Sequence, residues 1–186
     1  MARSRNNVIT HGLSGKVGDL VLFSQRFGQT FMGKIPIQTG KTSSIQRAVR
    51  DKFQLAVKYA RRCLQNPALK ELYAQRAGGG VTAFNLALAD FFIAPVIADI
   101  ITGGYTGTAG SQIEVQVTDD TKVKTVSISI IAADGTLIEE GAALQEPGTD
   151  QWLYTATVTN PLLTGSKVKA VATDLPGNFT REEKLV

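Results

Sequence analysis

The stretch Gln-Ile-Glu-Val-Gln-Val-Thr at residues 112–118 alternates polar and apolar side chains, and three later stretches repeat this pattern. The apolar positions of those later stretches are Val126, Ile128 and Ile130, then Trp152, Tyr154, Ala156 and Val158, then Val168, Ala170 and Ala172. Alternation with a period of two places every second side chain on one face of a β-strand. Asp134-Gly135 is typical of a tight hairpin turn, and residues 174–178 form a second turn sequence. Short, regularly spaced strands of this kind predict an all-β sandwich.

The residues before Ile101 have a different, helical period. One apolar face recurs at steps of three or four residues, and its members are Ile45, Val49, Phe53, Ala56, Ala60 and Leu64. Ser43 and Gln46 stand at capping-box spacing, which predicts that the helix begins there. Asn66-Pro67 ends this helix and begins a second, which stops at Gly78. A third helix is expected at residues 82–92, before Pro95.

A β-hairpin is predicted ahead of these helices. Two β-prone runs, residues 20–25 and 29–35, flank Arg26-Phe27-Gly28, with Gly28 expected at positive φ. Gly12, Gly15 and Gly18 precede the hairpin. A nucleotide-binding glycine loop follows a strand and opens a helix, whereas this one is followed by a strand, so the spacing favours structural turns.

The net charge of +4 hides a division along the chain. Residues 1–78 hold 14 Lys and Arg against 3 acidic residues, a net charge of +11. Residues 79–186 hold 6 Lys and Arg against 13 acidic residues, a net charge of −7. This asymmetry predicts two units with different surfaces. The basic end is suited to an acidic protein surface, including the acidic half of a neighbouring copy.

Few residues with catalytic or metal-binding chemistry are present. Cys63 is the only cysteine and His11 the only histidine, so the chain lacks the residues for a disulfide, a zinc site or a convincing nucleophilic set. The apolar run at 91–101 is interrupted by Pro95 and Asp99 and is too short to span a bilayer. We therefore predict no enzyme activity, no cofactor and no membrane span. No N-terminal secretion signal is recognised, and the expected location is cytoplasmic or within a particle or filament.

Residues 108–186 resemble bacterial immunoglobulin-like repeats. The resemblance is carried by Asp-Asp-Thr-Lys-Val at 119–123, by Trp152, and by Ala-Thr-Asp-Leu-Pro-Gly-Asn at 172–178. It implies an adhesive or spacer module rather than a reaction.

Residues 1–95 resemble a family of uncharacterised bacterial proteins, for which the resemblance implies no activity. That family has a Gly-x-x-Gly-Lys-x-Gly-Asp/Asn stretch, a hairpin and a Thr/Ser-x-x-Gln-x-x-x-Arg-x-x-Phe helix. The matching residues are Gly12, Gly15, Lys16, Gly18, Asp19, Ser43, Gln46, Arg50 and Phe53. The expected fold is an α+β N-terminal module of a β-hairpin plus about three helices at residues 1–100, followed by an all-β immunoglobulin-like sandwich at 101–186.

The hairpin carries more apolar surface than two strands can bury alone. The residues concerned are Phe23, Phe27, Phe31 and Met32, and basic residues of the first helix, Arg47, Arg50, Lys58 and Arg61, would add electrostatic fit. We therefore expect a non-enzymatic structural or interaction protein that self-associates into an oligomer or filament, with the immunoglobulin-like domain as a spacer or adhesive module. The alternatives are a nucleic-acid-associated protein that uses the basic helix 43–65, and a component of a phage or mobile-element particle.

Calcium is the one metal for which the chain offers candidate ligands. Asp119, Asp120 and Asp174 lie in expected sandwich loops that could meet at one end, and carboxylate oxygens suit Ca²⁺. Aspartate also populates turns for backbone reasons, and this role is the favoured one.

Overall fold

The computed structural model describes residues 2–4, 9–37, 40 and 42–186. The chain divides into two compact units, Met1–Asp51 and Lys52–Val186. This division falls within helix α1 (Ser44–Gln65), whereas the sequence pattern had placed a boundary near residue 100.

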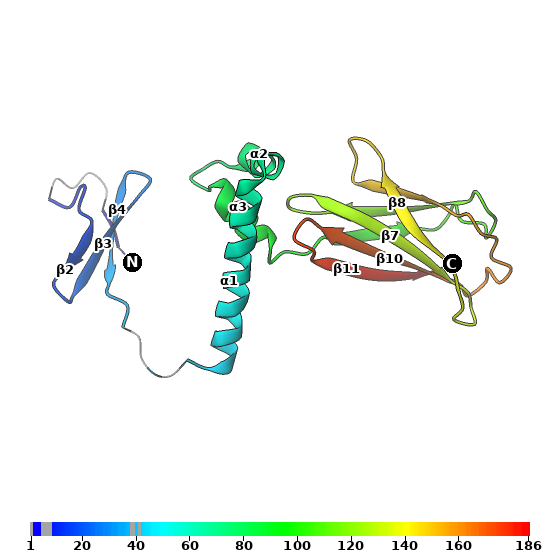
Figure 1. Ribbon diagram of the computed structural model, residues 1–186, viewed down its shortest axis with the longest axis horizontal. Coiled ribbons are helices and arrows are strands. Elements are labelled where there is room, and N and C mark those ends of the chain that lie inside the picture. Colours follow the sequence, from blue (N-terminus) through cyan, green and yellow to red (C-terminus); the bar gives the residue numbers. More distant parts are fainter. Residues whose placement is uncertain (1, 5–8, 38–39, 41) are drawn as a thin grey trace. The chain divides into compact units, whose positions relative to one another are not determined.

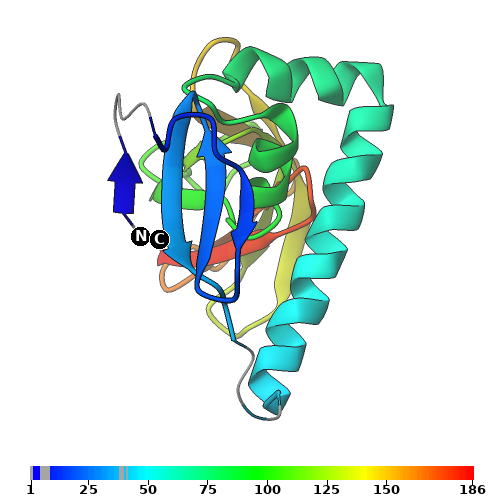
Figure 2. The same cartoon turned by 90° about the vertical axis from the view of Figure 1, so that its left-hand side faces the viewer.

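The first unit contains a four-stranded antiparallel sheet in the order β1-β4-β3-β2 (Figure 2). Its strands are β1 (Ala2–Ser4), β2 (Gly15–Val17), β3 (Val21–Arg26) and β4 (Gln29–Lys34). The predicted hairpin is confirmed, because β3 and β4 pair from Val21 with Lys34 to Arg26 with Gln29. Phe27 and Gly28 form its turn, with φ of 51° and 71°. Strands β1 and β2 extend the hairpin on both sides and were not predicted.

Three helices follow, α1, α2 (Pro67–Arg76) and α3 (Ala83–Asp90), and the caps predicted for the first two are present. The Ser43 hydroxyl accepts from the Gln46 N–H at 3.2 Å, and the Gln46 amide oxygen accepts from the Ser43 N–H at 3.1 Å. These bonds satisfy amide groups that a helix start leaves unpaired. Asn66 caps α2 ahead of Pro67, and Thr82 caps α3.

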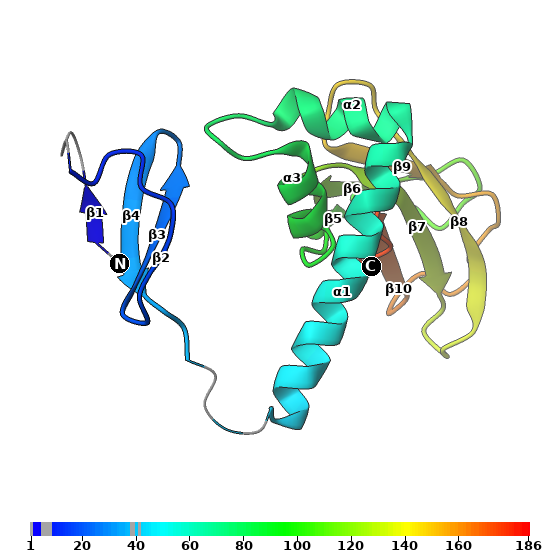
Figure 3. The same ribbon diagram turned by 60° about the vertical axis from the view of Figure 1, so that its left-hand side comes forward.

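The helices share a small core of Ala60, Cys63, Tyr73 and Ala87, against which Tyr59, Leu69 and Phe84 pack. The apolar stripe of α1 is buried only in its second half. Ile45 and Val49 in its first half are exposed, and the Phe53 ring, half-exposed, stacks on Phe92 at 6.5 Å between centroids. Figure 3 shows α1 running into α2, and α3 leading toward β5. Among the described residues, no helix is both long and apolar enough to cross a membrane.

Seven antiparallel strands form the β-rich part of the second unit (Figure 1). They are β5 (Val96–Ile101), β6 (Gln112–Thr118), β7 (Val123–Ile131), β8 (Leu137–Gln145), β9 (Gln151–Thr155), β10 (Lys167–Asp174) and β11 (Phe179–Leu185). Their order is β11-β10-β7-β8-β9-β6-β5. Strands β8 and β9 pair only at Leu144 with Leu153 and Gln145 with Trp152, so the sheet folds over there into two layers.

Most of the alternating positions predicted from the sequence fill the space between these layers. The prediction was wrong for Val158, which lies beyond the end of β9 and is 45% exposed. The fully buried members are Ile113, Val115, Val126, Ile128, Ile130, Val168, Ala170 and Ala172, and Trp152 and Tyr154 join them. The structure is therefore a β-sandwich or barrel-like arrangement combined with three helices. Because β5 begins at Val96, it takes in residues that the sequence pattern had assigned to the first module.

Gly141, in β8, packs against the ring of Tyr154. A Cβ atom at Gly141 would lie 2.7 Å from Tyr154 Cε2, and Tyr154 is itself buried. We expect Gly141→Ala to lower the free energy of unfolding by about 1–3 kcal/mol, because the ring has little room to move. Urea unfolding measures this change. Gly103→Ala is the matched control, since nothing lies within 4 Å of its Cβ position, and an equal loss in both variants would contradict the packing argument.

Candidate interaction surface and acidic cluster

The apolar residues of the N-terminal sheet are divided between its two faces. Directly paired residues of an antiparallel sheet project to the same side. Val17 pairs with Val21 and Phe23 pairs with Met32, so these four side chains share one face. We call this set the apolar sheet face. Phe31 pairs with Ser24 and projects to the opposite face.

The apolar sheet face is covered near Gln25 and Thr30, and it is exposed to solvent at Val17 and Met32. The Gln25 side-chain amide donates to Thr30 Oγ1 at 2.7 Å and to the Leu13 carbonyl at 3.0 Å, and Thr30 is buried. Val17 and Met32 at the open end keep 58% and 41% of their surface exposed, and Phe23 is half-buried. Of the aromatic residues singled out in the sequence, Phe27 is exposed, whereas Phe23 and Phe31 are half-buried.

Two features of Phe27, at the hairpin tip, are unfavourable for the stability of its own unit: the exposure of its ring and its backbone conformation. It is 75% exposed, and among the described residues it is the only non-glycine with positive φ. Left-handed backbone costs about 1–2 kcal/mol for a residue with a Cβ, and hairpin turns of this type usually carry Asn, Asp or Gly. A large apolar ring at such a position gains nothing within the sheet that would offset this strain.

The basic residues predicted on α1 all reach solvent. Arg47, Arg50, Lys58 and Arg61 are exposed, and Arg50 donates to Thr42 Oγ1 at 3.1 Å. The ion pair formed within the described part of the chain joins Lys184 to Asp99 at 2.8 Å. The four basic side chains are thus not neutralised by carboxylates of the described residues.

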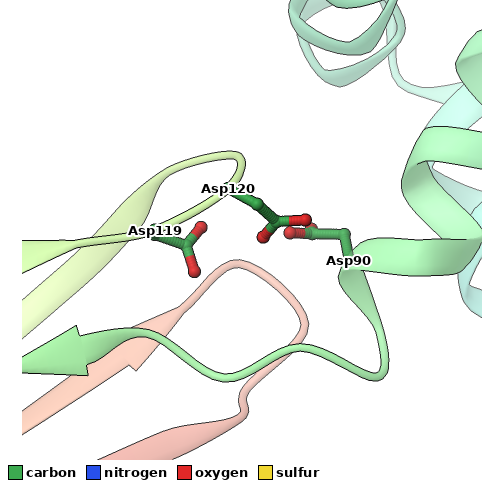
Figure 4. A group of neighbouring side chains, drawn as sticks. All are labelled: Asp90, Asp119 and Asp120. Atoms are coloured by element: carbon green, nitrogen blue, oxygen red, sulfur yellow. The ribbon is translucent and has the colours of Figure 1, made fainter.

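Three carboxylates converge where α3 meets the loop after β6 (Figure 4). Asp90 is the last residue of α3, and Asp119 and Asp120 directly follow β6. One oxygen from each lies within 4.8 Å of the other two. Asp90 is fully buried, Asp119 is half-buried and Asp120 is exposed, so the acidic cluster is buried at one side and open to solvent at the other.

A chain of hydroxyl groups holds Asp90 in place. Tyr73 donates its O–H to Asp90 Oδ2 at 2.6 Å, and the Tyr59 and Tyr73 hydroxyl oxygens are 3.0 Å apart. Burial raises the pKa of Asp90 to about 6, the Tyr73 bond opposes this rise, and the negative charges of Asp120 and Asp119 add to it. Burial also raises the pKa of Tyr73, so this hydroxyl stays protonated and acts as a donor.

Asp174, the third calcium candidate from the sequence, lies outside the acidic cluster and is engaged in a turn. Its Oδ1 accepts from the N–H groups of Gly177 and Asn178 at 2.7 and 2.6 Å, and its Oδ2 accepts from the Asn178 side-chain amide at 2.7 Å. That amide also reaches the carbonyls of Asp90 at 3.2 Å and Ile93 at 3.0 Å. The β10–β11 turn therefore holds the chain after α3 against the sandwich, which places Asp90 beside Asp119 and Asp120.

Sequence reasoning did not find Asp90. Its neighbours from Leu86 to Ile93 are almost all apolar. The pattern therefore predicts only that Asp90 is a polar residue at the end of a helix. The available signal was an acidic residue within an apolar run shortly before Pro95, a position where burial was to be expected. Its partners come from residues about thirty positions later, and only the tertiary fold brings them together.

Cys63 lies in the helical core and is 2% exposed. Burial raises the pKa of its thiol, which disfavours the nucleophilic thiolate. Its environment is that of a small core residue, as the sequence pattern indicated.

Comparisons with known proteins identify no family. No protein-family model matches the chain, and no curated protein matches it. A solved structure, that of CopC from Methylosinus trichosporium OB3b, is similar at a TM-score of 0.36 and 18% identity. The match covers 48% of this chain and 87% of that one. This likeness is too distant to carry a conclusion about fold or function.

Proposed function

We propose that this chain is a non-enzymatic structural or interaction protein that self-associates through its N-terminal sheet, with an immunoglobulin-like sandwich as spacer or adhesive module. The observation that carries the proposal is Phe27, a strained and exposed ring at the tip of the β3–β4 hairpin. Residues that break a local rule without local benefit are expected at functional sites.

The energetics of a single-layer sheet support this proposal. A sheet of a few short strands is marginal in water unless one face packs on another layer. Full burial of one Val, Met or Phe side chain contributes about 1.5–3 kcal/mol. Phe27, Val17 and Met32 are 75%, 58% and 41% exposed, so covering what remains of them would contribute about 3–5 kcal/mol before the entropic cost of association.

The proposed occupant of the apolar sheet face is a second copy of this chain, docked head to tail. Residues 1–78 carry a net charge of +11 and residues 79–186 a net charge of −7. Two basic halves placed face to face would repel each other, whereas a basic half meeting an acidic half is attracted. Arg47, Arg50, Lys58 and Arg61 would contribute to that attraction. A head-to-tail contact builds a ring when it closes and a filament when it does not.

Sedimentation velocity of the full chain tests this proposal. We expect a concentration-dependent assembly that Phe27→Asn weakens at least about tenfold, because Asn tolerates positive φ but lacks the ring. Gly28→Asn is the matched control. It changes the neighbouring turn residue, which has φ of 71° and open space around its Cβ position, and keeps the ring.

Two outcomes would contradict the proposal. One is a monomer at every concentration, and the other is assembly that Phe27→Asn leaves unchanged. Nuclease treatment before the run separates the nucleic-acid alternative, because assembly that nuclease abolishes would be bridged through the basic helix instead.

A further inference from the structure

We propose that Asp90, Asp119 and Asp120 bind a Ca²⁺ ion at the joint between α3 and the β-sandwich. All three residues belong to the second unit, and their oxygens converge from the end of α3 and from the loop after β6 (Figure 4). This proposal does not depend on self-association.

Two buried oxygens in the acidic cluster have no hydrogen-bond partner, Asp90 Oδ1 and Asp119 Oδ1. Asp90 is 0% exposed, and its carboxyl group points toward Asp120 in Figure 4. Buried carboxylate oxygens without partners are rare in folded proteins, and a bound ion is one of their recognised explanations. These atoms are therefore independent evidence for a ligand, beyond the grouping of acidic residues.

The second oxygen of each of these carboxylates is already fixed by the protein. Asp90 Oδ2 accepts from the Tyr73 hydroxyl, and Asp119 Oδ2 accepts from the N–H groups of Thr121 at 3.0 Å and Lys122 at 2.6 Å. Such outer hydrogen bonds orient metal ligands in proteins. Each carboxylate is held by one oxygen and leaves the other available, which is the arrangement that a metal site requires.

The negative charge of the acidic cluster needs a counter-charge. Three carboxylates have oxygens within 4.8 Å of one another, and none of them forms an ion pair with Lys or Arg of the described chain. Either protons or a cation must neutralise them at close range.

The chemistry of the ligands selects a hard cation. The acidic cluster offers carboxylate oxygens without His or Cys, which suits Ca²⁺ or Mg²⁺ rather than zinc or copper. Ca²⁺ accepts six to eight oxygens in flexible geometry, whereas Mg²⁺ demands a near-ideal octahedron. Carboxylates from two separate segments, with water entering beside exposed Asp120, fit the more tolerant ion. We expect a dissociation constant of about 10⁻⁴ M, in the range of weak structural calcium sites.

A bound ion would fix the end of α3 to the β-sandwich. Asp90 ends α3, and Asp119 and Asp120 begin the β6–β7 loop, so one ion would link these two elements. It would add to the Asn178 hydrogen bonds, which join the end of α3 to the β10–β11 turn. Because Ca²⁺ would bind only the folded arrangement, it would raise stability with the logarithm of its concentration once that concentration exceeds the dissociation constant.

The test uses the full chain, stripped with a chelator and titrated with CaCl₂ near neutral pH. Calorimetric titration and thermal unfolding are both recorded. At a Ca²⁺ concentration of about one hundred times the dissociation constant, we expect Tm to rise by about 5 °C. Asp90→Asn and Asp120→Asn should each weaken binding at least about tenfold. Asp120 is exposed, so its variant is expected to fold normally even if Asp90→Asn does not. Asp134→Asn, in an exposed turn elsewhere, should bind like the unaltered protein.

Three results would overturn the proposal. The first is no binding heat and no Tm shift with Ca²⁺ at about 10 mM. The second is a shift that Asp120→Asn leaves intact, which would place the ion elsewhere. The third is an equal response to MgCl₂ at equal concentration, which would reject the selection of calcium.

Discussion

Asp174→Ala is expected to lower the free energy of unfolding by about 3–5 kcal/mol, the largest effect of any single substitution proposed for this chain. Asp174 is fully buried and accepts three hydrogen bonds, from the N–H groups of Gly177 and Asn178 and from the Asn178 side chain. These donors are only partly buried, and a donor left without a partner costs up to about 1–3 kcal/mol. The loss would also release Asn178 from the carbonyls that follow α3.

Chemical denaturation of Asp174→Ala measures this loss, with Asp134→Ala as its matched control. Asp134 is also a turn aspartate, but it is exposed and accepts from the Thr136 N–H at 2.9 Å. Its removal should change stability by less than about 1 kcal/mol. Equal, small effects in the two variants would mean that the β10–β11 turn does not depend on the buried carboxylate.

Tyr73→Phe is expected to lower the free energy of unfolding by about 2–3 kcal/mol. Tyr73 is fully buried, and Phe fills nearly the same space, so the loss reports the hydroxyl alone. That hydroxyl donates to Asp90 Oδ2, and a hydrogen bond to a buried carboxylate contributes about 1.5–3 kcal/mol. Without it, the buried charge of Asp90 would lose the hydrogen bond that Tyr73 donates.

Tyr59→Phe is the control for Tyr73→Phe, because the Tyr59 hydroxyl contacts Tyr73 and does not contact Asp90 directly. It should cost about 1 kcal/mol. Calcium titration of the two variants gives a second measurement. If Tyr73 positions Asp90 for the ion, Tyr73→Phe should weaken Ca²⁺ binding and Tyr59→Phe should not. A loss of stability as large for Tyr59→Phe would contradict this account, because it would assign the stabilisation to the contact between the two hydroxyls and not to the bond with Asp90.

Local features of this fold were readable from the sequence. The Ser43–Gln46 capping box, the Asn66-Pro67 helix start and the Phe27-Gly28 turn each depend on residues within a few positions of one another. The alternating strands of the sandwich core were equally clear. The unpredicted strands have physical reasons for being missed. Strands β1 and β2 have three residues each, too few to show a period, and β5 contains a register shift between Ile97 and Asp99.

Two of the three residues of the acidic cluster could be predicted from the sequence. Asp119 and Asp120 stand together in an evident turn, so their grouping at one end of the sandwich could be expected. Asp90 joins them because Asn178 holds the end of α3, and no sequence period reports that contact. Asp174 was chosen for the same reason as Asp119, but its oxygens are used by its own turn. Carboxylates that close a turn and carboxylates left open to an ion have the same appearance in a sequence.

The apolar residues of the N-terminal sheet could be named from the sequence, but their arrangement on its two faces could not. Phe23, Phe31 and Met32 were treated as one apolar set, yet the pairing register places Phe31 on the opposite face from the other two. A hairpin prediction that left the end of each strand uncertain could not assign these faces, since a shift of one residue exchanges them.

Hydrogen exchange of the β3–β4 amides at several protein concentrations tests the central claim most directly. If a second copy covers the sheet, the protection of residues 21–34 should rise with concentration, while the sandwich core stays equally protected throughout. If these amides are equally protected at every concentration, including those at which sedimentation shows only monomers, the sheet is sheltered by its own chain and self-association through this surface is contradicted.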